Sequence, residues 1–285
     1  MGKSEQANQQ TDQQALDENI KNIRYKLVIL SGKGGVGKST VVVNLATSLA
    51  RQGKSVGILD TDLHGPNIAK MMGLEGTAMT ASSAEEIVPL ESHGIKVLSM
   101  ASFLPDADSP VVWRGPLKMK AIRQFLAETR WGTLDYLLVD SPPGTGDEPL
   151  SVCQLIPDMD GVIVVTTPQD VALLDSRKSV NFARLLKVPV LGIVENMSGF
   201  TCPHCGKQID LFKRGGGERA AKELNVPFLG RVPIDPRMVT SGDDGRPFVS
   251  DHGETEAARA MEGILSNILR NVEGAPVPTK EGETA

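Results

Sequence analysis

The sequence predicts an α/β fold, a mostly parallel sheet with helices on both faces. Short apolar runs typical of strands recur along the chain, and most are separated by stretches with helical spacing. The first run leads directly into a glycine-rich loop and then a helix. Such alternation places helices on both faces of a parallel sheet, and ligands then bind at the carboxyl ends of the strands. The expected strands are residues 26–30, 55–59, 95–100, 136–139, 161–166, 190–194 and 227–232.

The length of 285 residues and the apolar fraction of 40% suit one large domain. Residues 1–24 are polar and have too few apolar side chains to offset the entropy of ordering, so we expect a disordered tail. Residues 25–271 form the expected folded domain. In residues 272–285, proline and alternating charges replace a helical pattern, which predicts a flexible C-terminal tail.

Composition argues against several function classes. The net charge of −5 argues against a nucleic-acid partner bound through a broad basic face. The chain has no run of about 18 apolar residues, and its N-terminus is polar where a signal peptide needs an apolar core. Three cysteines are too few for a disulfide framework. We therefore expect a cytoplasmic protein, in a reducing compartment, with no membrane partner.

A phosphate-binding loop follows the first expected strand. Residues 31–40 read SGKGGVGKST and lead into the helical stretch 41–51, so the GxxxxGK motif, followed by Ser or Thr, stands in the strand–loop–helix context that it requires. Backbone N–H groups of the loop turn toward phosphate oxygens, Lys38 reaches the terminal phosphates, and the Ser39 hydroxyl ligates Mg²⁺. The sequence therefore predicts that ATP and Mg²⁺ are bound by Gly32, Lys33, Gly34, Gly35, Val36, Gly37, Lys38, Ser39 and Thr40.

Two aspartate-bearing strand ends complete this site. Asp140 follows an apolar strand and is placed to hold the Mg²⁺ shell, as in a Walker B element. The PPGTG sequence that comes next can respond to a bound γ-phosphate through a shift of its backbone, as switch loops do. Asp60 and Asp62 come at the end of the second strand. Asp60 could belong to this site, or it could equally cap a turn.

A cysteine pair follows the sixth expected strand. Cys202 and Cys205 form a CxxC motif with proline inside and glycine after it, a tight knuckle that offers half of a tetrahedral thiolate site. Cys153 lies in an apolar helical stretch and is interpreted as a buried small residue. A dimer could supply the pair twice at its two-fold axis. From the residues alone, an iron–sulfur cluster and a zinc ion fit equally, and a dithiol redox pair is a third interpretation.

The phosphate-binding loop carries a second lysine, Lys33, so that it reads KGGVGKST. This loop resembles the deviant Walker A group, which includes the MinD, ParA and nitrogenase iron-protein ATPases. The resemblance implies that Lys33 reaches the partner's nucleotide across a dimer, and that the active form is a nucleotide-sandwich homodimer. It also implies that Asp62 positions the attacking water. Spacing alone leaves a solvated surface lysine as the alternative for Lys33.

Five segments together resemble the Mrp/ApbC family of iron–sulfur cluster carrier ATPases over essentially the whole expected domain. They are SGKGGVGKST, DSPPGTGD, VENMSGF followed by CPHCG, GGGERAAKELNVPFLGRVPIDP and SGDDGRPFV. The resemblance implies a homodimer that holds a [4Fe-4S] cluster between subunits through Cys202 and Cys205. It also implies slow ATP hydrolysis and transfer of the cluster to client apo-proteins. Asn196, Pro233 and Asp235 are implied to approach the adenine ring. With this resemblance, the cluster is favoured over zinc.

Three function classes fit a P-loop protein with such a cysteine pair. They are a cluster carrier, a MinD-like or ParA-like positional ATPase with a zinc-bridged dimer, and a metabolic enzyme that phosphorylates or ligates a small molecule. A MinD-like protein would need a C-terminal basic amphipathic helix, whereas residues 274–285 contain proline and acidic side chains. A metabolic enzyme would not need CPHCG. The cysteines therefore favour the carrier.

Overall fold

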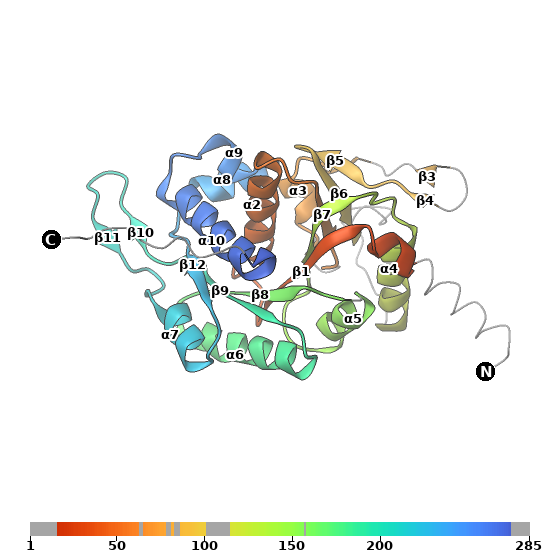
Figure 1. Ribbon diagram of the computed structural model, residues 1–285. Helices are drawn as coiled ribbons and strands as arrows, with labels where there is room; N and C mark the ends of the chain where they lie inside the picture. The colour runs from red at the N-terminus through yellow and green to blue at the C-terminus, as the bar shows by residue number, and fades with distance from the viewer. Residues whose placement is uncertain are drawn as a thin grey trace.

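The computed structural model describes residues 16–62, 65–77, 81–82, 86–100, 115–156 and 158–274. In this part of the chain, eight strands form one sheet in the order β12-β9-β8-β1-β7-β2-β6-β5 (Figure 1). All neighbours in this sheet are parallel except β5 and β6, which pair antiparallel at one edge. The strands of the sheet are β1 (Ile23–Ser31), β2 (Val56–Asp60), β5 (Leu90–Ser92), β6 (Ile95–Ser99), β7 (Leu134–Asp140), β8 (Gly161–Thr166), β9 (Val190–Glu195) and β12 (Phe228–Arg231).

The predicted mostly parallel sheet is confirmed, since each of the seven expected strands is present as β1, β2, β6, β7, β8, β9 or β12. The sequence did not indicate β5 or two small hairpins, β3 (Ala81–Ser82) with β4 (Glu86–Ile87), and β10 (Phe200–Thr201) with β11 (Gln208–Ile209). These strands are two or three residues long, which is too short to show a period of two.

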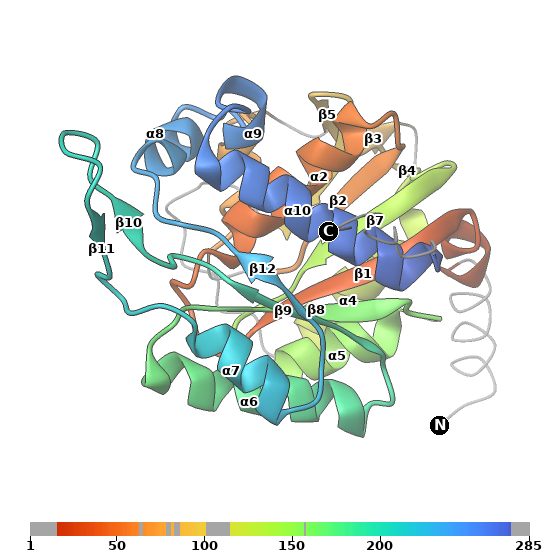
Figure 2. The same cartoon turned by 60° about the vertical axis from the view of Figure 1, so that its left-hand side comes forward.

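Helices cover both faces of the sheet (Figures 1 and 2). Side chains of β1 alternate between two cores: Leu27 and Ile29 pack with α2 and α10, whereas Val28 and Leu30 pack with α4 to α7. The described helices are α2 (Lys38–Arg51), α3 (Ile68–Met71), α4 (Gly115–Glu128), α5 (Asp147–Leu155), α6 (Asp170–Leu185), α7 (Gly216–Glu223), α8 (Arg237–Asp243), α9 (Phe248–Asp251) and α10 (Glu256–Glu273). None of the helices in the described residues is both long and apolar enough to cross a membrane.

The folded chain begins before the predicted boundary at residue 25. Residues 16–20 are helical, and Leu16 and Ile20 are buried with Ile23 in the core beside α4. Asn19 adds two hydrogen bonds of 2.7 Å from Nδ2 to main-chain carbonyl oxygens at the end of α4. The prediction of a tail up to residue 24 is wrong for residues 16–24, because these few apolar side chains are spaced to face one side of a short helix and strand.

At the other end of the domain, α10 extends to Glu273 and ends at Gly274, whose φ of 65° is left-handed. The side chain of Glu273 accepts a hydrogen bond of 2.6 Å from the Tyr136 hydroxyl, so the last turn is attached to the sheet. The rest of the predicted C-terminal tail, residues 275–285, lies outside the described residues, as do residues 1–15 of the predicted N-terminal tail.

The register of the central strands brings the predicted site together. Asp140, the last residue of β7, is the Cα partner of Ile29 in β1 and of Asp60 in β2. The loop that follows β1 therefore begins beside two strand-end carboxylates. The hairpin of β10 and β11 projects from the body at the far side of β12 and β9 (Figure 2).

Candidate functional site

The loop between β1 and α2 depends on its glycines. Gly35 and Gly37 have φ angles of 77° and 80°, in the left-handed region that favours glycine. Gly37 is the N-cap of α2, and a Cβ there would lie 2.2 Å from the Asn196 Nδ2 atom. Because the cap has no side-chain acceptor, the first-turn N–H groups of α2 are left to an external anion, the usual arrangement for phosphate binding.

Two side chains in the first turn of α2 meet Asp140. Lys38 donates from Nζ to one carboxylate oxygen, and Ser39 donates from Oγ to the other over 2.6 Å. Burial raises the pKa of Asp140, and the neighbouring Lys38 and Ser39 oppose this effect. The Ser39 hydroxyl and the Asp140 carboxylate are hard oxygen donors, the kind that Mg²⁺ prefers, so the pair fits this ion.

The two aspartates at the end of β2 have different surroundings. Asp60 is fully buried and accepts hydrogen bonds from Ser99 Oγ (2.9 Å) and from the Asp62 main-chain N–H (3.1 Å). Burial and the charge of Asp140 raise the pKa of Asp60 well above its usual range. Asp60 thus caps the turn, one of the two roles that the sequence left open for it. Asp62 accepts a hydrogen bond of 3.2 Å from the Gly65 main-chain N–H.

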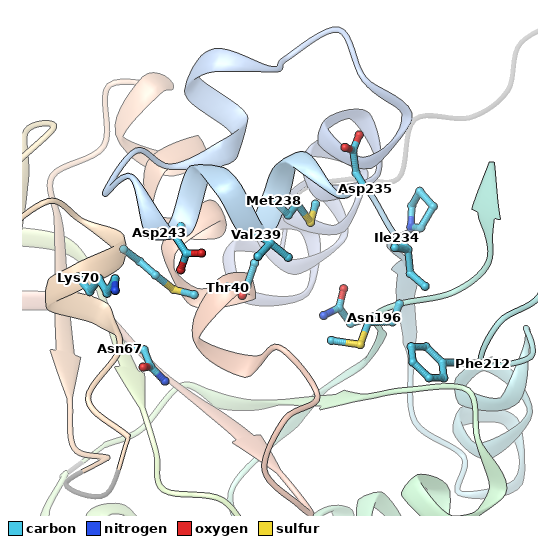
Figure 3. A pocket seen from close by; sticks show the side chains of 14 residues that line it. Thr40, Asn67, Lys70, Asn196, Phe212, Ile234, Asp235, Met238, Val239 and Asp243 are labelled. Atoms are coloured by element: carbon cyan, nitrogen blue, oxygen red, sulfur yellow. The ribbon is translucent and has the colours of Figure 1, made fainter. Parts of the chain in front are cut away.

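A pocket of about 300 Å³ lies beside the start of α2 (Figure 3). Its walls are mostly apolar, with polar groups at a few positions, as is usual for a small-molecule site. Asn196, Pro233 and Asp235, which the resemblance placed near an adenine ring, all line it. The full lining is Thr40, Asn67, Lys70, Met71, Asn196, Met197, Phe212, Pro233, Ile234, Asp235, Met238, Val239, Gly242 and Asp243.

This pocket is joined directly to the phosphate-binding loop. Asn196 Nδ2 donates to the Val36 carbonyl oxygen over 2.9 Å, and Thr40 belongs to both the loop and the pocket. A nucleoside in the pocket would therefore have its phosphates at the N-terminus of α2. Sequence reasoning missed the walls that come from α3 and α8, because no local pattern marks those residues.

The cysteine pair lies in the loop that connects β10 and β11. The Cys202 N–H donates to the Lys207 carbonyl over 3.0 Å, and the Gly206 N–H donates to the Cys202 carbonyl over 2.9 Å, so the predicted knuckle is present. Cys202 is half-buried, and Cys205 is exposed, as is His204. Hydrogen bonds from the main-chain N–H groups of His204 and Cys205 lower the pKa of the Cys202 thiol. A lower pKa favours the thiolate, which is the form that ligates metals.

The knuckle does not form a complete metal site within the described residues of one chain. There, no cluster of three or more His, Cys, Asp or Glu side chains is placed to hold a metal ion. Cys153 is buried in α5, as predicted, and burial raises the pKa of its thiol to about 12. One described chain therefore offers two thiols on an exposed hairpin and a third that is committed to the core.

Comparison with known proteins shows the family of this chain. The family model of NUBPL iron-transfer P-loop NTPases, of the ParA group, matches residues 22–269. The chain belongs to this family. Similar proteins include an iron–sulfur cluster carrier protein of Methanocaldococcus jannaschii, 53% identical over 90% of this chain and 88% of the relative. A second, from Pyrococcus furiosus, is 48% identical over 92% of each chain.

Solved structures confirm the fold of this iron-transfer P-loop NTPase. A nucleotide-binding protein of Archaeoglobus fulgidus in complex with ADP is 40% identical, with a TM-score of 0.73 over 82% of this chain and 92% of that one. MinD of Pyrococcus horikoshii, complexed with Mg-ADP, has a TM-score of 0.62 over 86% of this chain and 96% of its own, at 23% identity. At that identity, MinD supports the fold alone.

In this iron-transfer P-loop NTPase, one buried carboxylate accepts hydrogen bonds from both ends of the segment that carries the cysteines. Glu195, the last residue of β9, is fully buried and accepts from Ser198 Oγ over 2.5 Å and from the Gly215 N–H over 2.9 Å. It also accepts from the Gly217 N–H. Ser198 precedes the hairpin, and the two glycines begin α7 after it. The sequence pattern predicts no role for Glu195, since its position at a strand end does not separate it from Asp140.

We expect Glu195→Ala to lower the free energy of unfolding by about 3 kcal/mol, because it leaves three donors without their acceptor at about 1 kcal/mol or more each. Urea denaturation would measure the change. The matched control is Glu223→Ala, whose side chain is 45% exposed and pairs with Arg177 at the surface. The control should change stability by no more than about 0.5 kcal/mol. Equal losses in both variants would contradict the role of Glu195.

Lys33 is half-buried, and among the described residues it makes neither a hydrogen bond nor an ion pair. Its implied contact with a partner's nucleotide involves a second chain, so this role stays a prediction.

Proposed function

We propose that this protein binds and hydrolyses ATP with Mg²⁺, and that it carries a [4Fe-4S] cluster at a homodimer interface for transfer to apo-proteins. The observation that carries the proposal is that one chain combines a glycine-rich loop at the N-terminus of α2 with a hairpin that bears two cysteines. Relatives named iron–sulfur cluster carrier proteins and an ADP-bound relative support the cargo and the nucleotide. The MinD-like or ParA-like alternative is supported by fold only.

For nucleotide binding, the main-chain N–H groups from Gly32 to Thr40 would hold the phosphates, and the pocket lined by Asn196, Pro233 and Asp235 would hold the base. Ser39 and Asp140 would hold Mg²⁺, which offsets the negative charge of the phosphates when it is bound. Lys38, which Asp140 now orients, would donate to the terminal phosphates.

For hydrolysis, we propose that Asp62 positions the attacking water and that Lys33 of a second copy contacts the phosphates. Replacing Asp62 by Asn should slow turnover about 100-fold while the nucleotide affinity stays within about threefold, because a water-positioning group acts mainly in the transition state. Phosphate release at saturating ATP and the binding of a fluorescent nucleotide would measure the two quantities.

The control for this experiment is Asp244→Asn, since the Asp244 carboxylate is 48% exposed and bonds Arg246 at the surface. It should leave both turnover and affinity unchanged. If binding and turnover fall in parallel in Asp62→Asn, then Asp62 is instead a residue of the Mg²⁺ shell.

For the cargo, the count of thiols favours a shared site. A cubane cluster takes four thiolates, whereas the hairpin of one chain offers two. A symmetric dimer supplies the other two. Anaerobic reconstitution with iron and sulfide, followed by metal analysis and an absorption spectrum, tests the proposal. We expect a brown protein with about four irons per dimer. A colourless protein with one zinc per dimer would overturn the cluster assignment. The cytoplasmic location and the lack of nucleic-acid and membrane partners stay predictions.

A further inference from the structure

The segment that carries the cysteines has both of its ends in the wall of the nucleotide pocket. Asn196 and Met197, which precede the hairpin, line the pocket, and so does Phe212, which follows β11. Figure 3 shows Phe212 on the side of the pocket that holds Asn196 and Ile234, opposite Asn67 and Lys70. The chain therefore leaves the pocket, passes through the cysteine knuckle and returns to the pocket.

The first arm of the hairpin is also bonded to the pocket wall. The Ile234 N–H donates to the Gly199 carbonyl over 2.8 Å, and Phe200 forms a parallel bridge with Ile234. Ser198 donates its N–H to the Val232 carbonyl over 2.9 Å. Because Cys202 lies two residues beyond Phe200, a shift of the wall that holds the base would be passed to the knuckle through main-chain hydrogen bonds.

The returning arm presents an aromatic ring to the pocket. Phe212 is 39% exposed, whereas aromatic side chains of this size usually have most of their surface buried. The next residue, Lys213, donates from Nζ to the Asp170 carboxylate of α6 over 2.6 Å, so the chain beside Phe212 contacts the body of the domain at the surface. The ring lines the pocket with apolar surface open to a ligand, and a flat base that packs against it would remove that surface from water.

We propose that Phe212 couples the two sites. A nucleobase in the pocket packs against the Phe212 ring and thereby restrains residues 199–212, so that nucleotide occupancy sets the conformation in which Cys202 and Cys205 receive or release their cargo. This inference rests on the proposed nucleotide and cluster binding. Because coupling between two ligands is reciprocal, a cluster on the hairpin changes the nucleotide affinity by the same factor.

The first experiment uses the full-length, metal-free protein and measures hydrogen–deuterium exchange of residues 199–212 with and without ADP. ADP is added at a concentration that saturates each variant, as shown by equilibrium dialysis. In the wild type, ADP should slow exchange of this segment by about fivefold or more, the lower end of usual couplings. In Phe212→Ala, bound ADP should leave the exchange of this segment unchanged.

The matched control is Val239→Ala. Val239 lines the same pocket from α8 and is 68% exposed, but within the described part of the chain it makes no hydrogen bond with residues 199–212. This variant should retain the protection of residues 199–212 at saturating ADP. If Phe212→Ala binds ADP too weakly to saturate, Phe212→Leu replaces it, and its protection should fall below that of Val239→Ala. Protection equal to the wild type in the Phe212 variants, or no protection in the wild type, would overturn the coupling.

A second measurement compares ADP affinity with and without a reconstituted cluster. In the wild type, the two affinities should differ by about 5- to 150-fold, the usual range of such couplings. The ratio should fall to about one in Phe212→Ala and stay at the wild-type value in Val239→Ala. An unchanged ratio in Phe212→Ala would contradict the proposal. If the protein takes up no iron, the proposal that it carries a cluster is wrong. The exchange experiment on metal-free protein would still test the role of Phe212.

Discussion

Lys38→Ala is expected to weaken ATP binding about 100-fold while the chain stays folded. The side chain lies in the first turn of α2, at the helix end that would face the phosphates, and it is 6% exposed. A hydrogen bond to a charged group contributes about 1.5–3 kcal/mol, which corresponds to about 10- to 150-fold in affinity. The upper part of this range applies because a lysine at this position reaches more than one phosphate oxygen. Isothermal titration calorimetry with ATP would measure the loss.

This variant also removes the ionic partner of a buried carboxylate, so its folding must be measured separately. Losing one partner of a buried pair commonly costs about 3–5 kcal/mol. The cost is smaller here because burial already raises the pKa of Asp140, so that its carboxyl group can take up a proton and stay buried as a neutral group. A thermal melt followed by circular dichroism would establish that Lys38→Ala is folded at the temperature of the binding experiment.

Lys33→Ala is the matched control, since it removes a lysine from the same loop. Lys33 makes no ion pair among the described residues, so its loss should change the affinity of one chain by less than about fivefold. It should still reduce hydrolysis if Lys33 contacts the nucleotide of a second copy. Unchanged ATP affinity in folded Lys38→Ala would show that Lys38 does not bind the phosphates.

The features that the sequence predicted well are local. A strand that is apolar along most of its length, such as 161–166, carries its own signal, and all six of its residues are buried. The phosphate-binding loop is equally local, because glycine positions, lysine and hydroxyl are read within ten residues. The position of Asp140 beside this loop followed from one general rule, that parallel strands end at the same edge of the sheet.

The features that the sequence missed depend on distant contacts. The pocket walls from α3 and α8 are separated by more than 160 residues, and their meeting is decided by packing between helices. Residues 16–24 read as a polar tail because only a few apolar side chains attach them to the core. Short hairpins such as β10 and β11 lack enough residues for a periodic pattern.

Three strand-end carboxylates show why a pattern alone does not assign a role. Asp60, Asp140 and Glu195 each end a buried parallel strand. Asp140 meets Lys38 and Ser39, as a residue of a phosphate and Mg²⁺ site should. Asp60 caps its own turn, and Glu195 accepts hydrogen bonds from residues on both sides of the cysteine hairpin. The difference lies in their partners, which come from other parts of the chain.

Single substitutions of the hairpin cysteines should separate the two sites. Cys202→Ala and Cys205→Ala are each expected to abolish cluster binding. ATP affinity, compared between metal-free proteins, should stay unchanged, because both side chains lie on a hairpin outside the phosphate-binding loop. Cys153→Ala should keep the cluster and cost about 1 kcal/mol of stability, since it removes one buried sulfur from the core. Iron content after reconstitution, ATP titration and urea denaturation would measure these three quantities.

A mixed dimer tests whether the cluster is shared. One subunit is wild type, and the other carries both Cys202→Ala and Cys205→Ala; two different affinity tags allow this dimer to be purified. It should hold no stable cubane, because only the two thiolates of the wild-type hairpin are left, whereas a cubane takes four. The wild-type dimer that carries the same two tags is the control and should take up a full cluster. If the mixed dimer retains a full cluster, or if Cys153→Ala destroys it, the shared site is wrong and the cluster is bound within one subunit. One subunit has three cysteines, so at least one ligand of such a cubane would not be a cysteine.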